Sequence, residues 1–188
     1  MHQITTSLVP ILGRPVVFVC HQIEMDKVMQ YRPVKESDIP AICLLPESPE
    51  ELFYCFPNAS FPLSADNLRK SIAERADSTV IELRGQVVAF ANFYRWGQER
   101  CSIGNVVVAS AVRGEGVARY LINYMLKVAL EKHRAQEVTV SCFNPNTAGL
   151  LLYKTLGFRP FALEARGDHK GNPVVLIHMA VGRNALYN

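Results

Sequence analysis

A strand, a glycine turn and a helix start follow one another between Val106 and Ala118, an arrangement that can bind an anion. The β-branched run Val106–Val108 leads into Arg113-Gly114-Glu115-Gly116-Val117-Ala118, after which an amphipathic helix is predicted. The first backbone N–H groups of a helix have no partner inside it, and the helix dipole adds positive potential there. Gly114 and Gly116 carry no Cβ, so a phosphate can approach the backbone. The turn therefore favours phosphate binding.

A dinucleotide-binding turn is the obvious alternative, and the sequence argues against it. Arg119 stands where the third glycine of that fingerprint belongs. An acidic residue is also expected about 20 residues further on, at the end of a second strand. Ser141 and Cys142 follow the next apolar run instead.

A second segment, from Asn146 to Phe158, adds a different kind of chemistry. Asn146 precedes a predicted helix that carries Tyr153 near its end, and Gly157 is typical of a residue that terminates a helix. A tyrosine with an ordinary pKa of about 10 is protonated at neutral pH and can act as a general acid.

Together the two segments resemble the GCN5-related N-acetyltransferase (GNAT) superfamily. Its acetyl-CoA signature, Arg or Gln-x-x-Gly-x-Gly or Ala, is matched by Arg113, Gly116 and Ala118. Its second signature is matched by Asn146, Gly149 (one residue past the usual small residue), Leu152, Tyr153, Gly157 and Phe158. The resemblance covers about Tyr31 to Val181.

The resemblance implies acetyl-CoA as co-substrate and gives each matched position a role. By position, the residues implied to bind the coenzyme are Val106, Val108, Arg113, Gly114, Glu115, Gly116, Val117, Ala118 and Asn146. The valine N–H groups would also polarise the thioester carbonyl, and Tyr153 would protonate the departing thiolate. Each position also has a structural interpretation: the valines as a buried strand, Asn146 as an N-cap, Tyr153 as a core aromatic.

No residue stands out as the general base that would deprotonate the acceptor amine. Ribosomal-protein N-terminal acetyltransferases of this superfamily often have a Glu on the strand after the long helix, where this chain has Ser141. The remaining candidates are Glu82, Glu99, Asn105 (through water) and His169. We expect deprotonation through ordered water held by backbone carbonyls and by Asn105 or Glu82, with no single essential base.

These features predict an acetyl-CoA-dependent N-acetyltransferase that acts on the primary amine of a small molecule or amino acid by direct attack. A non-catalytic acyl-CoA-binding or sensor module and a protein N-terminal acetyltransferase are the alternatives. The aromatic- and proline-rich segment Glu47–Leu63, predicted as a loop, occupies the place that shapes the acceptor pocket in relatives.

The elements that position these residues alternate between strands and helices. Predicted strands are Gln30–Val34, Thr79–Arg84, Val87–Trp96, Cys101–Ala109, Glu137–Cys142, Phe158–Ala165 and Pro173–Val181. Predicted helices are Ile39–Leu45, a segment from Ser64 to about Ala76, Val117–Lys132 and Asn146–Leu156. This order is that of an α/β fold with a mixed, largely antiparallel central sheet flanked by helices. The resemblance adds a splayed strand pair that binds acyl-CoA.

Composition is that of an ordinary globular protein: 49% of the 188 residues are hydrophobic and 20% are charged. The net charge of +3 comes without a run of like charges, so we expect no nucleic-acid partner. The five cysteines have no metal-ligand spacing, which predicts no metal and a reducing, cytoplasmic location.

The first 28 residues differ from the rest. Their apolar stretch Ser7–Cys20 is interrupted by Pro10, Arg14 and Pro15, so neither a membrane span nor a signal peptide is predicted. We expect an N-terminal extension (1–28), an acetyltransferase domain (29–183) and a short tail (184–188). Homodimerisation, in which the extension packs on a second subunit, is an open alternative.

Overall fold

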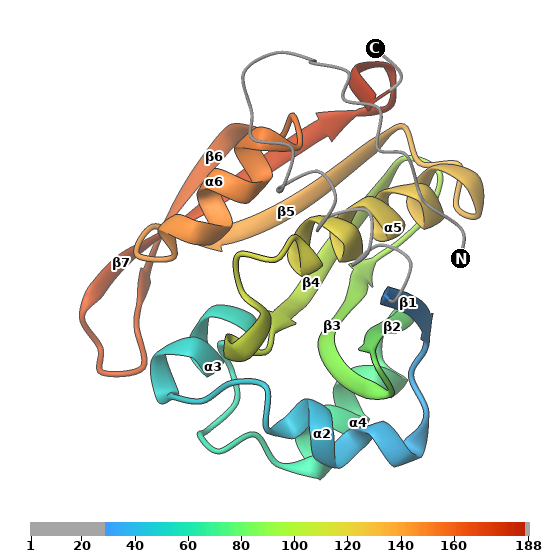
Figure 1. Ribbon diagram of the computed structural model, residues 1–188. Helices are drawn as coiled ribbons and strands as arrows, with labels where there is room; N and C mark the ends of the chain where they lie inside the picture. Colours follow the sequence, from blue (N-terminus) through green and yellow to red (C-terminus); the bar gives the residue numbers. More distant parts are fainter. Residues whose placement is uncertain (1–28, 187–188) are drawn as a thin grey trace, which may run out of the picture.

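Seven strands form one sheet in the computed structural model, which describes residues 29–186 (Figure 1). In chain order they are β1 (Met29–Pro33), β2 (Ala76–Leu83), β3 (Gln86–Arg95), β4 (Arg100–Val108), β5 (Glu137–Phe143), β6 (Arg159–Gly167) and β7 (Pro173–Gly182). The spatial order is β1-β2-β3-β4-β5-β7-β6. Only β4 and β5 run parallel, because the long helix α5 connects them; every other pair of neighbours is antiparallel. The mixed, largely antiparallel α/β fold is thereby confirmed.

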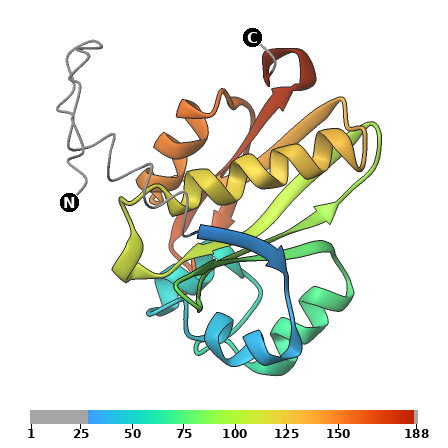
Figure 2. The ribbon, with the colours of Figure 1, turned by 45° about the vertical axis from the view of Figure 1, so that its right-hand side comes forward.

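Helices cover both faces of this sheet. They are α2 (Ile39–Cys43), α3 (Pro49–Cys55), α4 (Ala65–Ala73), α5 (Val117–Glu131) and α6 (Thr147–Thr155), with short 3₁₀ turns at Glu36–Asp38, Ser110–Val112 and Arg183–Leu186. Helices α5 and α6 lie on one face, and α2, α3 and α4 lie on the other, over the first four strands (Figures 1 and 2). Two hydrophobic clusters, one on each side of the sheet, hold these layers together.

Helix α5 is the amphipathic helix that the sequence predicts after the glycine turn. Leu121, Ile122 and Met125 are completely buried against the sheet. Truncating a side chain packed in this way to Ala typically costs about 2–5 kcal/mol. The helix is therefore a fixed support for the turn at its N-terminus.

The segment Glu47–Leu63 is not the loop that the sequence predicted, because helix α3 forms within it. Ser48 accepts a hydrogen bond from the Glu51 N–H at 3.2 Å, and Pro49 occupies the first helical position. A serine cap followed by proline is a helix start signal. The surrounding prolines and aromatic residues are typical of a loop, so this start signal was not recognised in the sequence. The predicted N-terminal extension lies outside the described residues.

Candidate active site

Strands β4 and β5 separate halfway along their length. Their parallel pairing runs from Arg100 opposite Glu137 to Ile103 opposite Val140, and among the described residues no pair follows. Both strands continue beyond that point, β4 to Val108 and β5 to Phe143. The result is a V-shaped opening between two neighbouring strands.

A β-bulge in β4 accompanies the opening. The β3–β4 register pairs Asn92 with Gly104 and then Phe90 with Val107. Between these pairs, two residues of β4, Asn105 and Val106, lie opposite the single β3 residue Ala91. Asn105 has a φ of +52°, and its buried side chain is held from both sides. Its Nδ2 donates to the Cys55 carbonyl at 2.8 Å, and its Oδ1 accepts from the Ser71 hydroxyl at 3.2 Å.

The backbone of β4 directs N–H groups into the opening. The Ala109 N–H donates to the Val88 carbonyl of β3 at 2.8 Å. Successive backbone groups alternate in direction along a strand, so the Val108 and Val106 N–H groups point away from β3, towards β5. Because β5 has diverged there, both valines retain donors for another partner.

The glycine turn between β4 and α5 adopts the conformation for which its glycines are suited. Gly114 and Gly116 have φ values of +85° and +87°, which side-chain-bearing residues rarely adopt. Gly116 is the N-cap of α5, and no side chain caps this end. The N–H groups of Val117, Ala118 and Arg119 therefore have no intrahelical partner.

Arg113 lies at the turn, but its side chain binds protein. Its Nη1 donates to Glu51 Oε1 at 2.6 Å and its Nε to the Val108 carbonyl at 3.2 Å. The arginine holds the pKa of the Glu51 carboxyl below its ordinary value. Nearby, the Ser110 hydroxyl donates to Glu47. Two glutamates, Glu47 just before α3 and Glu51 within it, thus hold the two ends of the 3₁₀ turn that leads into the glycine turn.

Asn146 caps α6, as the structural interpretation predicted: its Oδ1 accepts from the Gly149 N–H at 3.0 Å. A Cβ at Gly149 would lie only 3.0 Å from both Asn146 Nδ2 and Cys142 Sγ. Glycine at this position therefore lets α6 begin close to β5. This bond uses the amide oxygen, so the Asn146 Nδ2 can still act as a donor.

Tyr153 lies on α6 and is 6% exposed, with its ring edge-on to Phe158 at 5.8 Å. Burial raises the pKa of its phenol above the ordinary value of 10, and the nearby thiols of Cys142 and Cys55 add to the effect. Burial also raises the pKa of these two thiols to about 12. Tyr153 is thus a neutral proton donor in a buried environment.

Three of the predicted base candidates are bound elsewhere. Glu82, on β2, accepts from Arg32 at 2.8 Å, and Glu99 pairs with Arg95 at 3.6 Å. The Asn105 amide is occupied by the contacts described above. His169 lies in the β6–β7 loop, with its ring 6.1 Å from that of Phe53.

Sequence reasoning missed another histidine, His178 of β7. Its Nδ1 lies 2.9 Å from Ser141 Oγ, and its Nε2 lies 3.4 Å from Glu164 Oε2. The available signal was a single polar residue inside the apolar strand Val174–Val181. Its partners come from β5 and β6, so only strand pairing reveals the cluster.

A small cavity of about 170 Å³ lies between α3, the start of α6 and the β6–β7 loop. Its lining residues are Glu50, Phe53, Tyr54, Pro145, Asp168, His169, Lys170, Asn172 and Val174. The Tyr54 hydroxyl donates to Glu50 at 2.5 Å, and Phe53 packs on Phe143 of β5 at 4.3 Å between ring centroids.

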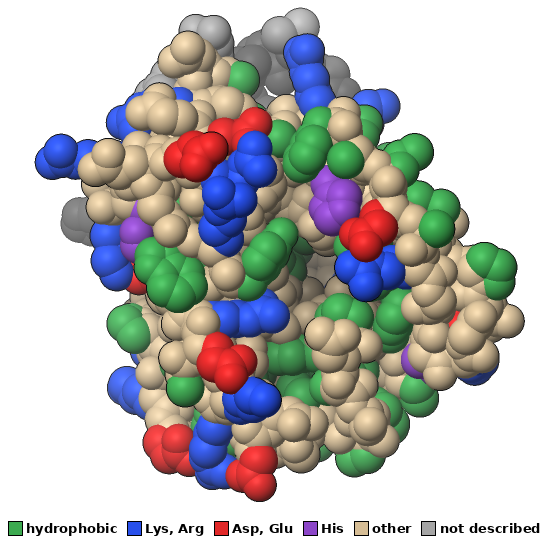
Figure 3. All heavy atoms as spheres, turned by 180° about the vertical axis from the view of Figure 1, so that it is seen from behind, with side chains coloured by type: hydrophobic (Ala, Val, Ile, Leu, Met, Phe, Trp, Pro, Cys, Tyr) green, Lys and Arg blue, Asp and Glu red, His purple; other side chains and the backbone are tan. Residues whose placement is uncertain are grey.

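Figure 3, which shows the face opposite that of Figure 1, has a hollow near its centre bordered by charged, hydrophobic and histidine side chains.

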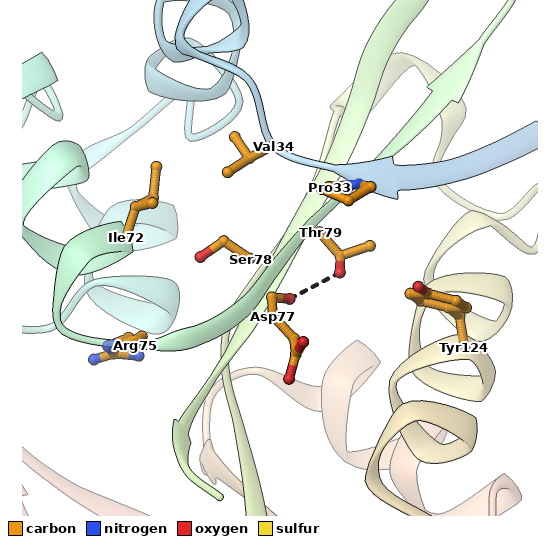
Figure 4. Close-up of a pocket in the computed structure, with 8 residues that line it drawn as sticks. All are labelled: Pro33, Val34, Ile72, Arg75, Asp77, Ser78, Thr79 and Tyr124. Carbon is orange, nitrogen blue, oxygen red and sulfur yellow. Dashed lines mark hydrogen bonds between the residues drawn. The ribbon is translucent and has the colours of Figure 1, made fainter. Parts of the chain in front are cut away.

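A larger cavity, of about 250 Å³, is found at the start of β2 (Figure 4). It is lined by Pro33, Val34, Ile72, Arg75, Asp77, Ser78, Thr79 and Tyr124. Asp77 is bound by Lys132 and by His133, whose Nε2 lies 2.6 Å from the carboxylate. None of these residues lines the cavity between α3 and the β6–β7 loop, so the two cavities are distinct.

Within residues 29–186, no group of three His, Cys, Asp or Glu side chains is placed to hold a metal ion. Over the same range, no helix has the length and apolar character needed to cross a bilayer.

Solved structures with this fold include several N-acetyltransferases. A ribosomal-protein-alanine N-acetyltransferase from Brucella melitensis is 21% identical (TM-score 0.69), with 81% of this chain and 99% of that chain covered. A spermidine N-acetyltransferase from Vibrio cholerae, in complex with CoA and spermine, is 16% identical (TM-score 0.71; 86% and 99% covered). A putative acetyltransferase from Salmonella typhimurium, solved with acetyl-CoA, is 19% identical (TM-score 0.66; 82% and 93% covered). At these identities the likeness shows a shared fold.

The model of the acetyltransferase (GNAT) family matches residues 44–158, which is more than half of the chain. The matched range runs from the end of α2 through the V-shaped opening, the glycine turn and α6. On this match, together with the seven-stranded fold, the chain belongs to the GNAT acetyltransferase family.

Proposed function

We propose that this protein is an acetyl-CoA-dependent N-acetyltransferase that acts on the primary amine of a small molecule or amino acid. The observation that carries the proposal is the V-shaped opening between β4 and β5, which ends at an uncapped helix N-terminus. An extended acyl carrier with a diphosphate needs both features: unpaired strand donors for its arm and helix donors for its phosphates.

The coenzyme is bound mainly by backbone groups. The diphosphate accepts from the N–H groups of Gly114, Gly116, Val117 and Ala118. Glu115 belongs to the same turn, but its N–H donates to the Val112 carbonyl at 3.4 Å. The pantetheine arm runs along β4, where the Val106 and Val108 N–H groups are available, and Asn146 Nδ2 donates to it from α6. Arg113 acts from its position beside Glu51, by holding the turn in place.

Tyr153 protonates the CoA thiolate after the amine has attacked the thioester. A donor whose pKa is raised by burial transfers a proton poorly to an ordinary thiolate. The leaving sulfur occupies the same buried region, however, where the pKa of the Cys55 and Cys142 thiols rises to about 12. Burial therefore shifts donor and acceptor in the same direction and keeps the transfer feasible.

The acceptor amine enters from the cavity between α3 and the β6–β7 loop. Its volume of about 170 Å³ suits a small molecule or the end of a larger one. Phe53 and Tyr54 form an aromatic wall, and the carboxylates of Glu50 and Asp168 favour a positively charged amine. Asp168 stays ionised, because hydrogen bonds from Asn172 and Lys170 hold its pKa below the ordinary value.

A thiol-release assay tests the proposal. The protein is mixed with acetyl-CoA and one of five amines: L-methionine, ethanolamine, benzylamine, spermidine or a hexapeptide beginning with alanine. Release of CoA with a small amine, together with the acetylated product in mass spectrometry, supports the proposal. CoA binding without turnover supports a sensor module instead, and turnover with the peptide alone supports a protein N-terminal acetyltransferase.

We propose that the protein acts in the cytoplasm. Cys43, Cys55, Cys101 and Cys142 are free thiols, which fits the cytoplasm as the place of action. We propose neither a nucleic-acid nor a membrane partner, and homodimerisation stays a prediction.

A further inference from the structure

Three polar side chains form a chain across the sheet, on the face opposite α5 and α6. Ser141 Oγ lies 2.9 Å from His178 Nδ1, and His178 Nε2 lies 3.4 Å from Glu164 Oε2. They come from the adjacent strands β5, β7 and β6, with Ser141 directly opposite His178 in the register. The imidazole is therefore bridged on both nitrogens, and strand pairing fixes its position.

Ser141 stands at the apex of the V-shaped opening. The last β4–β5 pair is Ile103–Val140, so Ser141 is the first residue of β5 beyond it. Successive side chains of a strand point to opposite faces. Ser141 thus faces His178, while its neighbour Cys142 lies on the face of Tyr153 and influences the pKa of that phenol. A group that takes a proton from the amine and one that gives a proton to the sulfur would then act from opposite sides of one thioester.

We propose that His178 is the proton acceptor for the amine, reached through the hydroxyl of Ser141, and that Glu164 is a positioning residue for His178. The inference rests on the proposed acetyltransferase function and names the base for that reaction. In the resting state, Nε2–H donates to Glu164, and Nδ1 accepts the hydrogen bond from Ser141.

The proton moves in one balanced step. An N–H bond of the ammonium breaks as its proton passes to Ser141 Oγ, and the hydroxyl proton of Ser141 passes to His178 Nδ1. The amine becomes neutral and nucleophilic, and the imidazole becomes an imidazolium beside the Glu164 carboxylate. His178 then returns its proton to water, to which about a quarter of its side chain is exposed.

The surroundings of His178 carry charges of both signs. Arg166 binds Glu164 at 2.9 Å, from the same strand. On the other side, the centroid of the Phe161 ring lies 6.1 Å from that of the imidazole. The Arg100 guanidinium lies over the Phe161 ring, 6.0 Å from its centroid. Arg100 in turn forms an ion pair with Glu137. The two arginines are therefore neutralised by carboxylates, and Glu164 is the charged group that contacts the imidazole directly.

The first test measures the tautomer of His178 and needs no acceptor. Long-range ¹H–¹⁵N NMR of the full chain distinguishes a protonated Nε2 from a protonated Nδ1. We expect the Nε2–H tautomer in the wild type and loss of that preference in Glu164→Ala, which removes the acceptor. An Nδ1–H tautomer in the wild type would overturn the proposal, because Nδ1 could not then accept from Ser141.

The second test measures kcat/KM against pH with the amines of the thiol-release panel. In His178→Ala and Ser141→Ala, we expect losses of about 10²–10³-fold at pH 7. The loss should shrink as the pH approaches the amine's own pKa, about 10 for a lysine-like amine, because free amine then needs no base. Added imidazole should restore activity to His178→Ala, and Ser141→Thr, which keeps the hydroxyl, should stay within tenfold of the wild type.

His133→Gln provides the matched control, since His133 also pairs with a carboxylate (Asp77) but lies outside the site; its activity should stay within twofold. If kcat/KM fell equally at every pH and imidazole did not rescue it, the two residues would have a structural role and the proposal would be overturned. Acetylation of Ser141, detected by mass spectrometry, would also overturn it. Wild-type turnover with none of the amines would contradict the proposed function as well. Turnover that is equal in wild type and variants would contradict this inference alone.

Discussion

The Arg113 guanidinium donates to the Glu51 carboxylate across 2.6 Å and so holds the glycine turn against helix α3. The arginine of the proposed coenzyme turn is therefore held by a protein partner. This link joins the proposed coenzyme turn to the helix that also lines the proposed acceptor cavity.

Breaking that link should weaken coenzyme binding through the position of the turn. We predict that Glu51→Gln and Arg113→Gln each weaken CoA affinity by about twofold to fivefold, the effect of an exposed ion pair worth up to about 1 kcal/mol. Isothermal titration calorimetry measures both. Tighter CoA binding in Glu51→Gln would show that the freed arginine binds the diphosphate directly.

Gly116→Glu should abolish CoA binding, because it places a side chain and a negative charge at the N-terminus of α5. The φ of +87° also strains any L residue at this position. Gly85→Glu is the matched control, since Gly85 has a φ of +80° with open space around it, in the β2–β3 hairpin. Unchanged CoA affinity in a folded Gly116→Glu protein, by calorimetry, would contradict the phosphate assignment.

Tyr153→Phe should lower kcat by about 10²–10⁴-fold with little change in CoA affinity. The ring and its packing on Phe158 remain, so the melting temperature should be preserved. Since burial raises the pKa of the phenol, the wild type should also show no loss of kcat from this group up to about pH 10. A Phe variant with wild-type kcat, where chemistry is rate-limiting, would exclude Tyr153 as the acid.

Asp38→Asn should destabilise the fold by about 2 kcal/mol at pH 7, because the 5% exposed Asp38 accepts two hydrogen bonds from Arg32. Arg32 holds the pKa of Asp38 below its ordinary value of 3.8. The ionised group therefore stabilises the protein above about pH 4, and this stabilisation is lost as the pH falls through the lowered pKa.

Urea unfolding at pH 7 and pH 3 checks that dependence, with the difference between wild type and variant expected to shrink at pH 3. Glu36→Gln is the control, since its exposed pair with Arg69 should contribute less than about 1 kcal/mol. A difference that is the same at both pH values would assign the effect to packing.

A chain that begins at Met29 should bind CoA as the full chain does. Met29 is the first residue of β1, is 3% exposed and accepts a hydrogen bond from the Tyr120 hydroxyl at 3.2 Å. Calorimetry and size-exclusion chromatography of both chains test this. Weaker binding or a change of oligomeric state would show that residues 1–28 belong to the functional protein.

Local patterns in the sequence determined the glycine turn, helices α5 and α6 and most of the strands. A glycine with positive φ, an Asn that caps a helix and an apolar stripe are all set within a few residues, so they can be read in order along the chain. Helix α3 was missed because its start signal, Ser48-Pro49, lay among prolines and aromatic residues that are typical of a loop.

Only the tertiary structure decided which side chains meet. Arg113 and Glu51 are 62 residues apart, and Ser141 and His178 are 37 residues apart. Strand pairing brings Ser141, His178 and Glu164 together, and the β4–β5 pairing ends at the point where the site opens. The sequence specifies each strand by its period of two, but the register between strands depends on the packing of the whole sheet.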